Sequence, residues 1–312
     1  MTDITAVGEI LIDLTQSGLT EQGIPRFDAN PGGAPANLAV AASRLGARTA
    51  FVGRVGRDSY GDFLRRTLEE NRVDVTGLSV DPTQHTTLAI VSLDEKGERS
   101  FSFYRDPSAD VNLRFEDVPA ELLGNTRILH FGSVSLTAEP SRSATLRAAR
   151  TAKEKGALVS YDPNYRASLW PDEDTAIERM LQPLELADIL KVSDEELPLL
   201  TGTEELESGS AALAAKGARL VLVTLGADGV FYRFGALTGR VPGIRVKVGD
   251  TNGAGDTFFG AALSQLVKCE SLDALTAEEL ERILRFANRA AAITTSRHGA
   301  IPAMPTLEEL EA

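Results

Sequence analysis

The sequence predicts an α/β protein with a doubly wound, mostly parallel sheet flanked by helices. Short segments that are apolar throughout, as in strands buried on both faces, alternate with longer amphipathic segments along most of the chain. Neither a Pro/Ser-rich linker nor a repeat interrupts this alternation, so residues 1–312 are predicted to form a single domain. The expected strands are residues 5–14, 48–55, 127–131, 157–161, 189–192 and 220–224, and the main expected helices are residues 38–45, 141–155, 175–186, 194–200, 210–216, 257–267 and 288–295.

Composition excludes several classes of function. A net charge of -13 disfavours a nucleic-acid or anionic-membrane partner, because the protein's field repels phosphate groups. The single cysteine, Cys269, cannot form an internal disulfide, and we interpret it as a small hydrophobic residue. His85, His130 and His298 are scattered and give no zinc-type cluster. The N-terminus lacks a basic region followed by an apolar core, so we expect a cytoplasmic protein.

The first expected strand, residues 5–14, carries Asp13 near its end. In an open α/β sheet, ligands bind at the carboxyl ends of the strands, so Asp13 is a candidate acceptor for the hydroxyls of a polyol. The alternative is an acid that caps the turn after the strand. Next, Gly32 and Gly33 precede the helix 38–45, and Asn37 stands in its first turn, where a donor and an acceptor together suit sugar hydroxyls. Helix-start chemistry alone would also explain these three residues.

From residue 75 the pattern changes. The runs 86–93 and 99–105 alternate partially and are separated by residues 94–97, which end in Gly97, so they predict an antiparallel hairpin. Such an insert in an α/β chain is expected to lie as a flap over one end of the sheet. Phe101, Phe103 and Arg105 would share one face and could contact a ligand, or could bury their rings against a second subunit.

Polar side chains follow three later strands, in segments 162–166, 191–196 and 224–229. Because the carboxyl ends of parallel strands meet at one edge, these segments predict a single crevice. Arg166 and Lys191 would supply the fixed cations that an acidic protein needs to bind phosphate. Glu196 could hold magnesium through water, although it could also be an ordinary first-turn acid. Residues 224–229 could be only a turn.

The stretch 250–256, Asp-Thr-Asn-Gly-Ala-Gly-Asp, follows an apolar strand-like alternation at residues 244–248 and opens the helix 257–267. Gly253, Ala254 and Gly255 allow close approach of a ligand to the unpaired amides of a helix start, which bind anions. Asp256 is an acid within this anion site. We therefore interpret Asp256 as a general base that deprotonates an alcohol as it attacks the γ-phosphate of ATP. An ordinary first-turn acid after a Gly-rich turn is the alternative. Walker-type and Gly-x-Gly-x-x-Gly motifs are missing from the sequence.

Four stretches together resemble the PfkB-type, ribokinase-like carbohydrate kinases, and within them the fructokinases. They are residues 32–37 (Gly-Gly-Ala-Pro-Ala-Asn), residues 103–110 with Phe-Tyr-Arg and Ser-Ala-Asp, residues 162–166 (Asp-Pro-Asn-Tyr-Arg) and residues 250–258. The resemblance covers the whole chain. It implies a ribokinase-like sheet with a small β-sheet lid, formed by inserted strands at approximately 15–30 and 75–110, and a homodimer that pairs through this lid.

The resemblance also implies roles by position. Asp256 matches the catalytic base, and Gly253, Ala254 and Gly255 match the anion hole. The sugar side matches Asp13, Gly32, Gly33, Asn37, Phe103, Arg105 and Arg166. The nucleotide side matches Lys191, Ser193, Thr224, Gly226, Gly229 and Asn288, with Glu196 toward Mg²⁺ through water and Asp250 where a monovalent cation such as K⁺ is held through backbone oxygens. Ser193 replaces the Asn of the family's Asn-x-x-Glu motif, and Asn252 replaces the commoner Thr.

These observations predict ATP- and Mg²⁺-dependent phosphorylation of a sugar's primary hydroxyl, with D-fructose as the expected substrate. One alternative is a 2-keto-3-deoxygluconate kinase, because that group shares the stretch 162–166. The other is a catalytically idle sugar-binding sensor of the same fold, against which the retained Asp256 and anion loop count.

Overall fold

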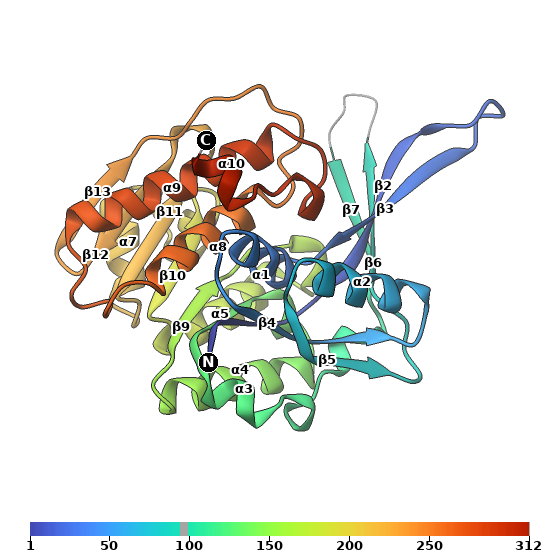
Figure 1. The fold of residues 1–312 in the computed structure, drawn as a ribbon, viewed down its shortest axis with the longest axis horizontal. Coiled ribbons are helices and arrows are strands. Elements are labelled where there is room, and N and C mark those ends of the chain that lie inside the picture. Colours follow the sequence, from blue (N-terminus) through green and yellow to red (C-terminus); the bar gives the residue numbers. More distant parts are fainter. Residues whose placement is uncertain (94–98, 312) are drawn as a thin grey trace.

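The computed structural model describes residues 1–93 and 99–311, and its largest element is a nine-stranded sheet (Figure 1). The strands from β11 to β5 run parallel, and β12 and β13 pair antiparallel at one edge. In spatial order the strands are β13 (Leu237–Val241), β12 (Val230–Phe234), β11 (Leu220–Thr224), β10 (Ile189–Ser193), β9 (Leu158–Asp162), β8 (Thr126–Gly132), β1 (Thr2–Val7), β4 (Thr49–Gly56) and β5 (Asp74–Asp81). The prediction of an α/β fold with a mostly parallel sheet is confirmed.

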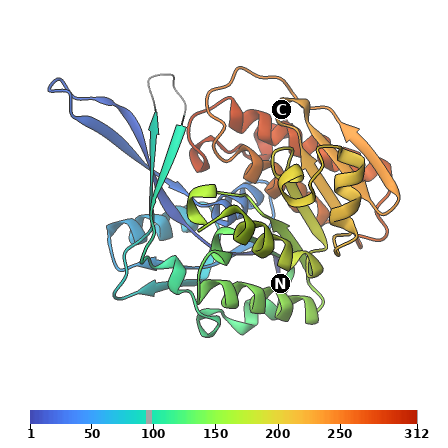
Figure 2. The same cartoon turned by 180° about the vertical axis from the view of Figure 1, so that it is seen from behind.

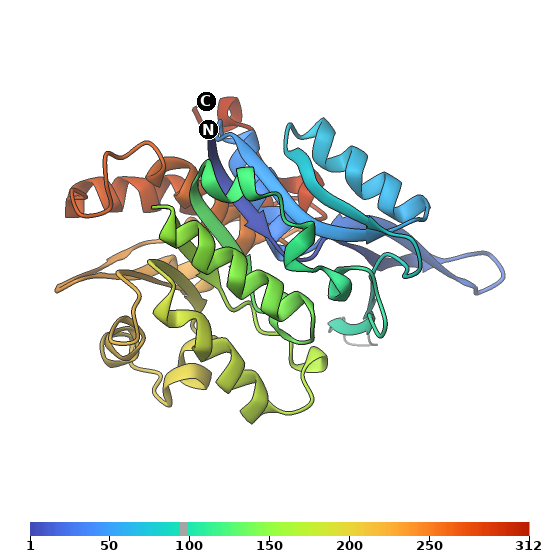
Figure 3. The same cartoon turned by 90° about the horizontal axis from the view of Figure 1, so that it is seen from below.

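Helices cover both faces of this sheet, as the view from below shows (Figure 3). One face packs against α3 (Ala120–Gly124), α4 (Ser141–Glu154), α5 (Glu173–Leu181), α6 (Glu196–Thr201) and α7 (Leu206–Ala214). The other packs against α1 (Ala34–Arg44), α2 (Ser59–Glu70), α8 (Ala254–Leu266), α9 (Ala277–Thr295) and α10 (Leu307–Glu311). Within residues 1–93 and 99–311, no helix has the length and apolar character needed to cross a bilayer.

A second, four-stranded sheet stands to one side of the large sheet (Figures 1 and 2). Its strands are, in order, β3 (Pro25–Gly32), β2 (Leu11–Leu19), β6 (Leu88–Leu93) and β7 (Arg99–Tyr104). β6 and β7 are antiparallel, as the pattern of residues 86–105 predicts, whereas β2 and β6 are parallel. The predicted turn at residues 94–97 lies outside the described residues.

Two of the predicted strands are wrong. The segment 5–14 is not one strand: β1 ends at Val7, and the chain turns at Gly8 (φ 150°) before β2 begins in the small sheet. A side chain at Gly8 would approach Pro35 Cγ of α1 to 2.8 Å, so this turn requires glycine. Residues 244–248 form no strand, and the alternating residues Ile244, Val246 and Val248 are exposed (47%, 37% and 61%), so the alternation does not mark a buried face. β5, which falls partly within the predicted insertion 75–110, pairs with β4 in the large sheet.

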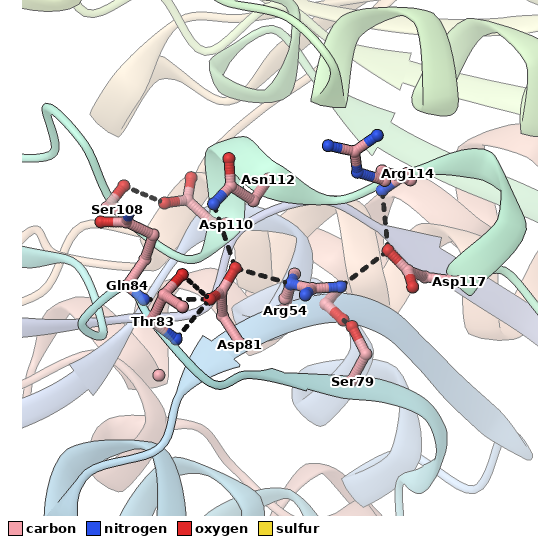
Figure 4. Close-up of polar contacts among 12 residues, drawn as sticks. Arg54, Ser79, Asp81, Thr83, Gln84, Ser108, Asp110, Asn112, Arg114 and Asp117 are labelled. Atoms are coloured by element: carbon pink, nitrogen blue, oxygen red, sulfur yellow. Dashed lines mark hydrogen bonds and ion pairs between the residues drawn. The ribbon is translucent and has the colours of Figure 1, made fainter.

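A network of polar contacts connects the segments before and after the β6–β7 insertion to the large sheet (Figure 4). Arg54 of β4 donates to Asp81 at the end of β5 (3.0 Å) and to Asp117 beyond the insertion (2.8 Å). Asp81 also accepts hydrogen bonds from the amide of Thr83 (2.8 Å) and the side chain of Asn112 (3.0 Å). Both ends of the insertion are therefore held at one point on the large sheet.

Candidate active site

Helix α8 begins at the predicted anion loop. Its N-cap, Gly253, has a left-handed conformation (φ 71°), and a side chain there would approach Ala300 Cβ to 2.9 Å. Gly253 has no side chain to cap the helix; the Ala254 amide donates to the Thr251 carbonyl (3.3 Å), and the Gly255 and Asp256 amides remain available to a ligand. A side chain at Gly255 would lie 3.3 Å from Lys191 Nζ. The loop can therefore bring backbone amides and one buried cation to the same anion.

A cavity lies beside this loop, between the carboxyl-end loops of the large sheet and the four-stranded sheet. Residues far apart in the sequence line it: Glu9, Leu11, Asp13, Gly33, Ala34, Asn37, Phe103, Val134, Asn164, Arg166, Asn252, Gly253, Asp256 and Ala300. This set includes the predicted base and most of the predicted sugar-side residues. The structure thus brings together side chains from β2, α1, β7, the loop after β9 and the start of α8.

Asp256 lines the cavity from the first turn of α8 and is 9% exposed. Its Oδ2 accepts a hydrogen bond from Asn37 Nδ2 (2.8 Å), and its Oδ1 accepts one from Asn164 Nδ2 (3.3 Å). Burial raises the pKa of Asp256, against the opposing effects of the Asn37 hydrogen bond and of the positive charges of Lys191 and Arg166. A raised pKa makes a carboxylate a stronger base, as general-base catalysis requires.

Asp13 lines the cavity from β2, not from the large sheet as the sequence suggested. Burial raises the pKa of its carboxyl to about 7, and the charge of Arg166 acts in the opposite direction. Gly32 does not line the cavity, but a side chain there would collide with the Asp13 carboxylate. Gly32 therefore leaves the space that the Asp13 side chain occupies.

Arg105 lies outside the cavity lining, although Phe103 on the same strand contributes to it. The Arg105 guanidinium is buried and donates to Asp110 Oδ2 (2.7 Å), Thr137 Oγ1 (2.6 Å) and the Val134 carbonyl (3.1 Å). These donors therefore connect the end of β7 to Asp110 and to residues 134–137. The side chain of Phe101 lies outside the part of the chain that the structure describes.

Lys191 and Asp162 form a buried ion pair (Nζ to Oδ2, 2.9 Å) at the carboxyl ends of β9 and β10. In the next turn, Ser193 and Glu196 bond reciprocally: the Ser193 amide donates to Glu196 Oε2 (2.8 Å), and the Glu196 amide donates to Ser193 Oγ (3.1 Å). These reciprocal bonds have the form of a capping box just before α6, and they fix the Glu196 side chain beside the end of β10. Glu196 Oε1 accepts from the Tyr165 amide (2.6 Å).

The other predicted nucleotide-side residues lie away from the cavity. Thr224 ends β11 and donates to the Val192 carbonyl (3.3 Å), and Asn288 of α9 donates to the Pro242 carbonyl (3.0 Å). Gly226 and Gly229 flank a short turn after β11, and both have positive φ. None of these four residues is among the described residues that line the cavity.

Asp250 holds the anion loop in place. Its Oδ1 accepts from the Asn252 amide (2.8 Å) and its Oδ2 from the Gly299 amide (3.2 Å). These contacts join the loop to the segment after α9.

Sequence reasoning missed several lining residues. Asn164 carried a signal, since it lies within the stretch 162–166 and is an Asn with positive φ (47°). Ala34 and Asn252 also stood within stretches that were singled out. Nothing in the local pattern pointed to Glu9, Leu11, Val134 or Ala300. Glu9 is 3% exposed, accepts a hydrogen bond from the Ala34 amide (3.1 Å) and so caps the start of α1.

Glu9→Gln is expected to flatten the dependence of stability on pH. Burial raises the pKa of Glu9 from 4.5 to about 7, so the folded protein retains a proton that the unfolded chain releases above pH 4.5. The resulting stabilisation is fully present below pH 4.5 and is lost as the pH rises toward 7, by roughly 3 kcal/mol. Urea unfolding at several pH values measures this slope. An equal slope in the variant would contradict the raised pKa.

The model of the pfkB family carbohydrate kinases matches residues 1–307. Probable fructokinase-2 of Arabidopsis thaliana is 46% identical, over 97% of this chain and 93% of that protein. The structure of a fructokinase with bound ATP from Xylella fastidiosa superposes with a TM-score of 0.93 at 38% identity, covering 100% of this chain and 98% of that chain. The fructokinase of Vibrio cholerae O395, bound to fructose, ADP and a calcium ion, has a TM-score of 0.91 at 38% identity with the same coverage. On this evidence the chain belongs to the pfkB family of carbohydrate kinases.

Proposed function

We propose that this protein transfers the γ-phosphoryl group of ATP to the primary hydroxyl of D-fructose and forms fructose 6-phosphate. The observation that carries the proposal is the position of Asp256, a buried carboxylate that lines a cavity and belongs to the first turn of α8, where the Gly255 and Asp256 amides are available to an anion. Fructokinases of Arabidopsis, Xylella and Vibrio align over nearly the whole chain, which supports fructose as the acceptor.

The residues of the cavity suggest how the reaction proceeds. Asp13, Asn37 and Arg166 bind the sugar hydroxyls and direct one of them at Asp256. Asp256 accepts the proton as the hydroxyl oxygen attacks the γ-phosphorus, and the bond from phosphorus to the bridging oxygen of ADP breaks. The first-turn amides of residues 253–256 stabilise the charge on the transferred group, with Lys191 behind Gly255.

The nucleotide is proposed to lie along the strand edge from Lys191 to Thr224, beyond the sugar cavity. When bound, magnesium would neutralise charge on the ATP phosphates. Both carboxylate oxygens of Glu196 already accept hydrogen bonds from backbone amides. This side chain therefore fits binding of magnesium through a water molecule better than direct coordination. The backbone around Asp250 is proposed for K⁺.

The lid is proposed to cover the bound sugar and to pair with the lid of a second copy. Phe103 reaches the cavity from β7. The small sheet and its hairpin also expose large apolar side chains that a second copy could cover: Leu19 (59%), Ile24 (60%), Phe27 (42%) and Tyr104 (64%). A cytoplasmic location stays part of the same proposal.

A coupled ADP assay with ATP, magnesium and potassium tests the substrate. We expect fructose to exceed 2-keto-3-deoxygluconate in kcat/KM by at least about tenfold. Three carboxyl groups, those of Glu9, Asp13 and Asp256, share the lining with Arg166, the one cation among the described lining residues, so the site has little positive charge to pair with the carboxylate of a sugar acid. Comparable use of the sugar acid would overturn the assignment of fructose. Absence of sugar-dependent ADP release would instead indicate an idle sugar-binding protein.

A further inference from the structure

The loop after β9 brings Asn164 into contact with Asp256. Asn164 Nδ2 donates to Asp256 Oδ1 (3.3 Å), while Asn37 Nδ2 donates to Asp256 Oδ2 (2.8 Å). The two carboxamides come from different elements, the start of α1 and the loop 163–166. Each oxygen of the carboxylate thus has one donor, which fixes the plane of the carboxylate and leaves its outward lone pairs for a substrate proton.

The backbone of Asn164 is held in an uncommon conformation. Its φ of 47° lies in the left-handed region, which Asn tolerates better than most residues. The next residue holds the loop in place, since the Tyr165 amide donates to Glu196 Oε1 (2.6 Å) and the Arg166 guanidinium donates to the Tyr165 carbonyl (3.0 Å). Uncommon backbone conformations that the surroundings maintain occur often at functional sites.

We propose that Asn164 is a positioning residue for the general base: its carboxamide orients the Asp256 carboxylate and stabilises the ionised form. The inference rests on the proposed role of Asp256. Asn37 is the partner in this arrangement, and Glu196 contributes indirectly by holding the loop that carries Asn164.

The charged groups around Asp256 and its hydrogen-bond donors determine whether the loss of Asn164 raises or lowers the pKa of Asp256. Lys191 of β10 and Arg166 of the loop after β9 favour the ionised carboxylate, whereas Asp13 of β2 and Asp162 of β9 are acids that interact with it unfavourably when ionised. Asn164 is a neutral donor whose hydrogen bond also favours the ionised carboxylate. Loss of that donor should raise the pKa of Asp256, so the acid limb of the kcat profile should move to higher pH.

The test compares Asn164→Gly and Asn164→Asp with the unmodified enzyme, using fructose and ATP from low to high pH. Glycine removes the donor and accepts the left-handed backbone. We expect kcat of the glycine variant to fall about tenfold near the acid limb, because a hydrogen bond to a charged group contributes a free energy equivalent to about a tenfold change in rate. The difference in kcat from the unmodified enzyme should become smaller at high pH. KM for fructose and for ATP should change by less than about twofold. Asn164→Asp places a second carboxylate beside Asp256 and should move the limb further in the same direction.

Three results would overturn the inference. The first is a uniform loss of kcat at all pH values, which a structural role predicts. The second is a raised KM for fructose with an unmoved acid limb, which a sugar contact predicts. The third is unchanged kinetics in both variants. Arg72→Gly is the matched control, since Arg72 also has positive φ (59°) but is exposed after α2, and this variant should keep the unmodified pH profile.

Asp256→Asn, measured in parallel, separates this inference from the proposed function. Normal turnover in Asp256→Asn would refute the general base itself. If Asp256→Asn is inactive while Asn164→Gly is unaffected, the base stands and only the role of Asn164 fails.

Discussion

Asp256→Asn is expected to lower kcat by about 10²–10⁴-fold, the contribution typical of general acid–base catalysis. Asn preserves the size of the side chain and can still accept a hydrogen bond from Asn37, so the fold and ATP binding should persist. The variant loses the capacity to take a proton from the attacking hydroxyl. Steady-state kinetics with fructose measure the loss of kcat. Calorimetry of ATP binding and the thermal unfolding midpoint show whether ATP binding and the fold persist.

Asp62→Asn is the matched control, because Asp62 is also a first-turn acid, in α2, but is exposed and remote from the cavity. It should leave kcat unchanged and lower stability by no more than about 1 kcal/mol through the helix dipole. If Asp256→Asn behaves like Asp62→Asn, then Asp256 is an ordinary first-turn acid and the proposed mechanism is wrong.

Arg105→Met is expected to lower the free energy of unfolding by about 3–5 kcal/mol, because it leaves Asp110 buried without its cation. Asp110 also accepts hydrogen bonds from Thr87 before β6 and from Ser108 (2.7 Å) after β7. The Arg105–Asp110 pair therefore connects both ends of the β6–β7 hairpin. Its loss should loosen the lid as well as the fold, which chemical denaturation and hydrogen exchange of β6 and β7 would measure.

The resemblance to known kinases implies instead that Arg105 acts on the sugar side. A direct sugar contact predicts a raised KM for fructose with little loss of stability, and that outcome would show that the lid rearranges to bring Arg105 to the substrate. Arg285→Met is the control, since Arg285 forms an exposed i,i+4 pair with Glu281 and should cost less than about 1 kcal/mol. Adding Asp110→Asn to Arg105→Met should restore part of the lost stability.

Much of the fold could be predicted because its signals are local. The uniformly apolar segments at 127–131, 157–161, 189–192 and 220–224 became β8, β9, β10 and β11, since strands buried on both faces must be apolar along their whole length. The glycines before residues 38 and 257 likewise marked the starts of α1 and α8. The predicted site residues lie near the ends of these strands and the starts of these helices. Five of them, Asp13, Gly33, Asn37, Arg166 and Asp256, line the same cavity.

The sequence by itself therefore determined most of the succession of strands and helices and several of the segments that line the cavity, because periodicity and turn chemistry act over a few residues. Only the tertiary structure decided which sheet a strand joins and which side chain meets which. It divided the segment 5–14 at Gly8 between two sheets, directed Arg105 to Asp110, and placed Glu9 and Asn164 in the cavity. These outcomes depend on contacts between distant segments, such as Asn37 and Asn164 with Asp256, and no local pattern encodes such contacts.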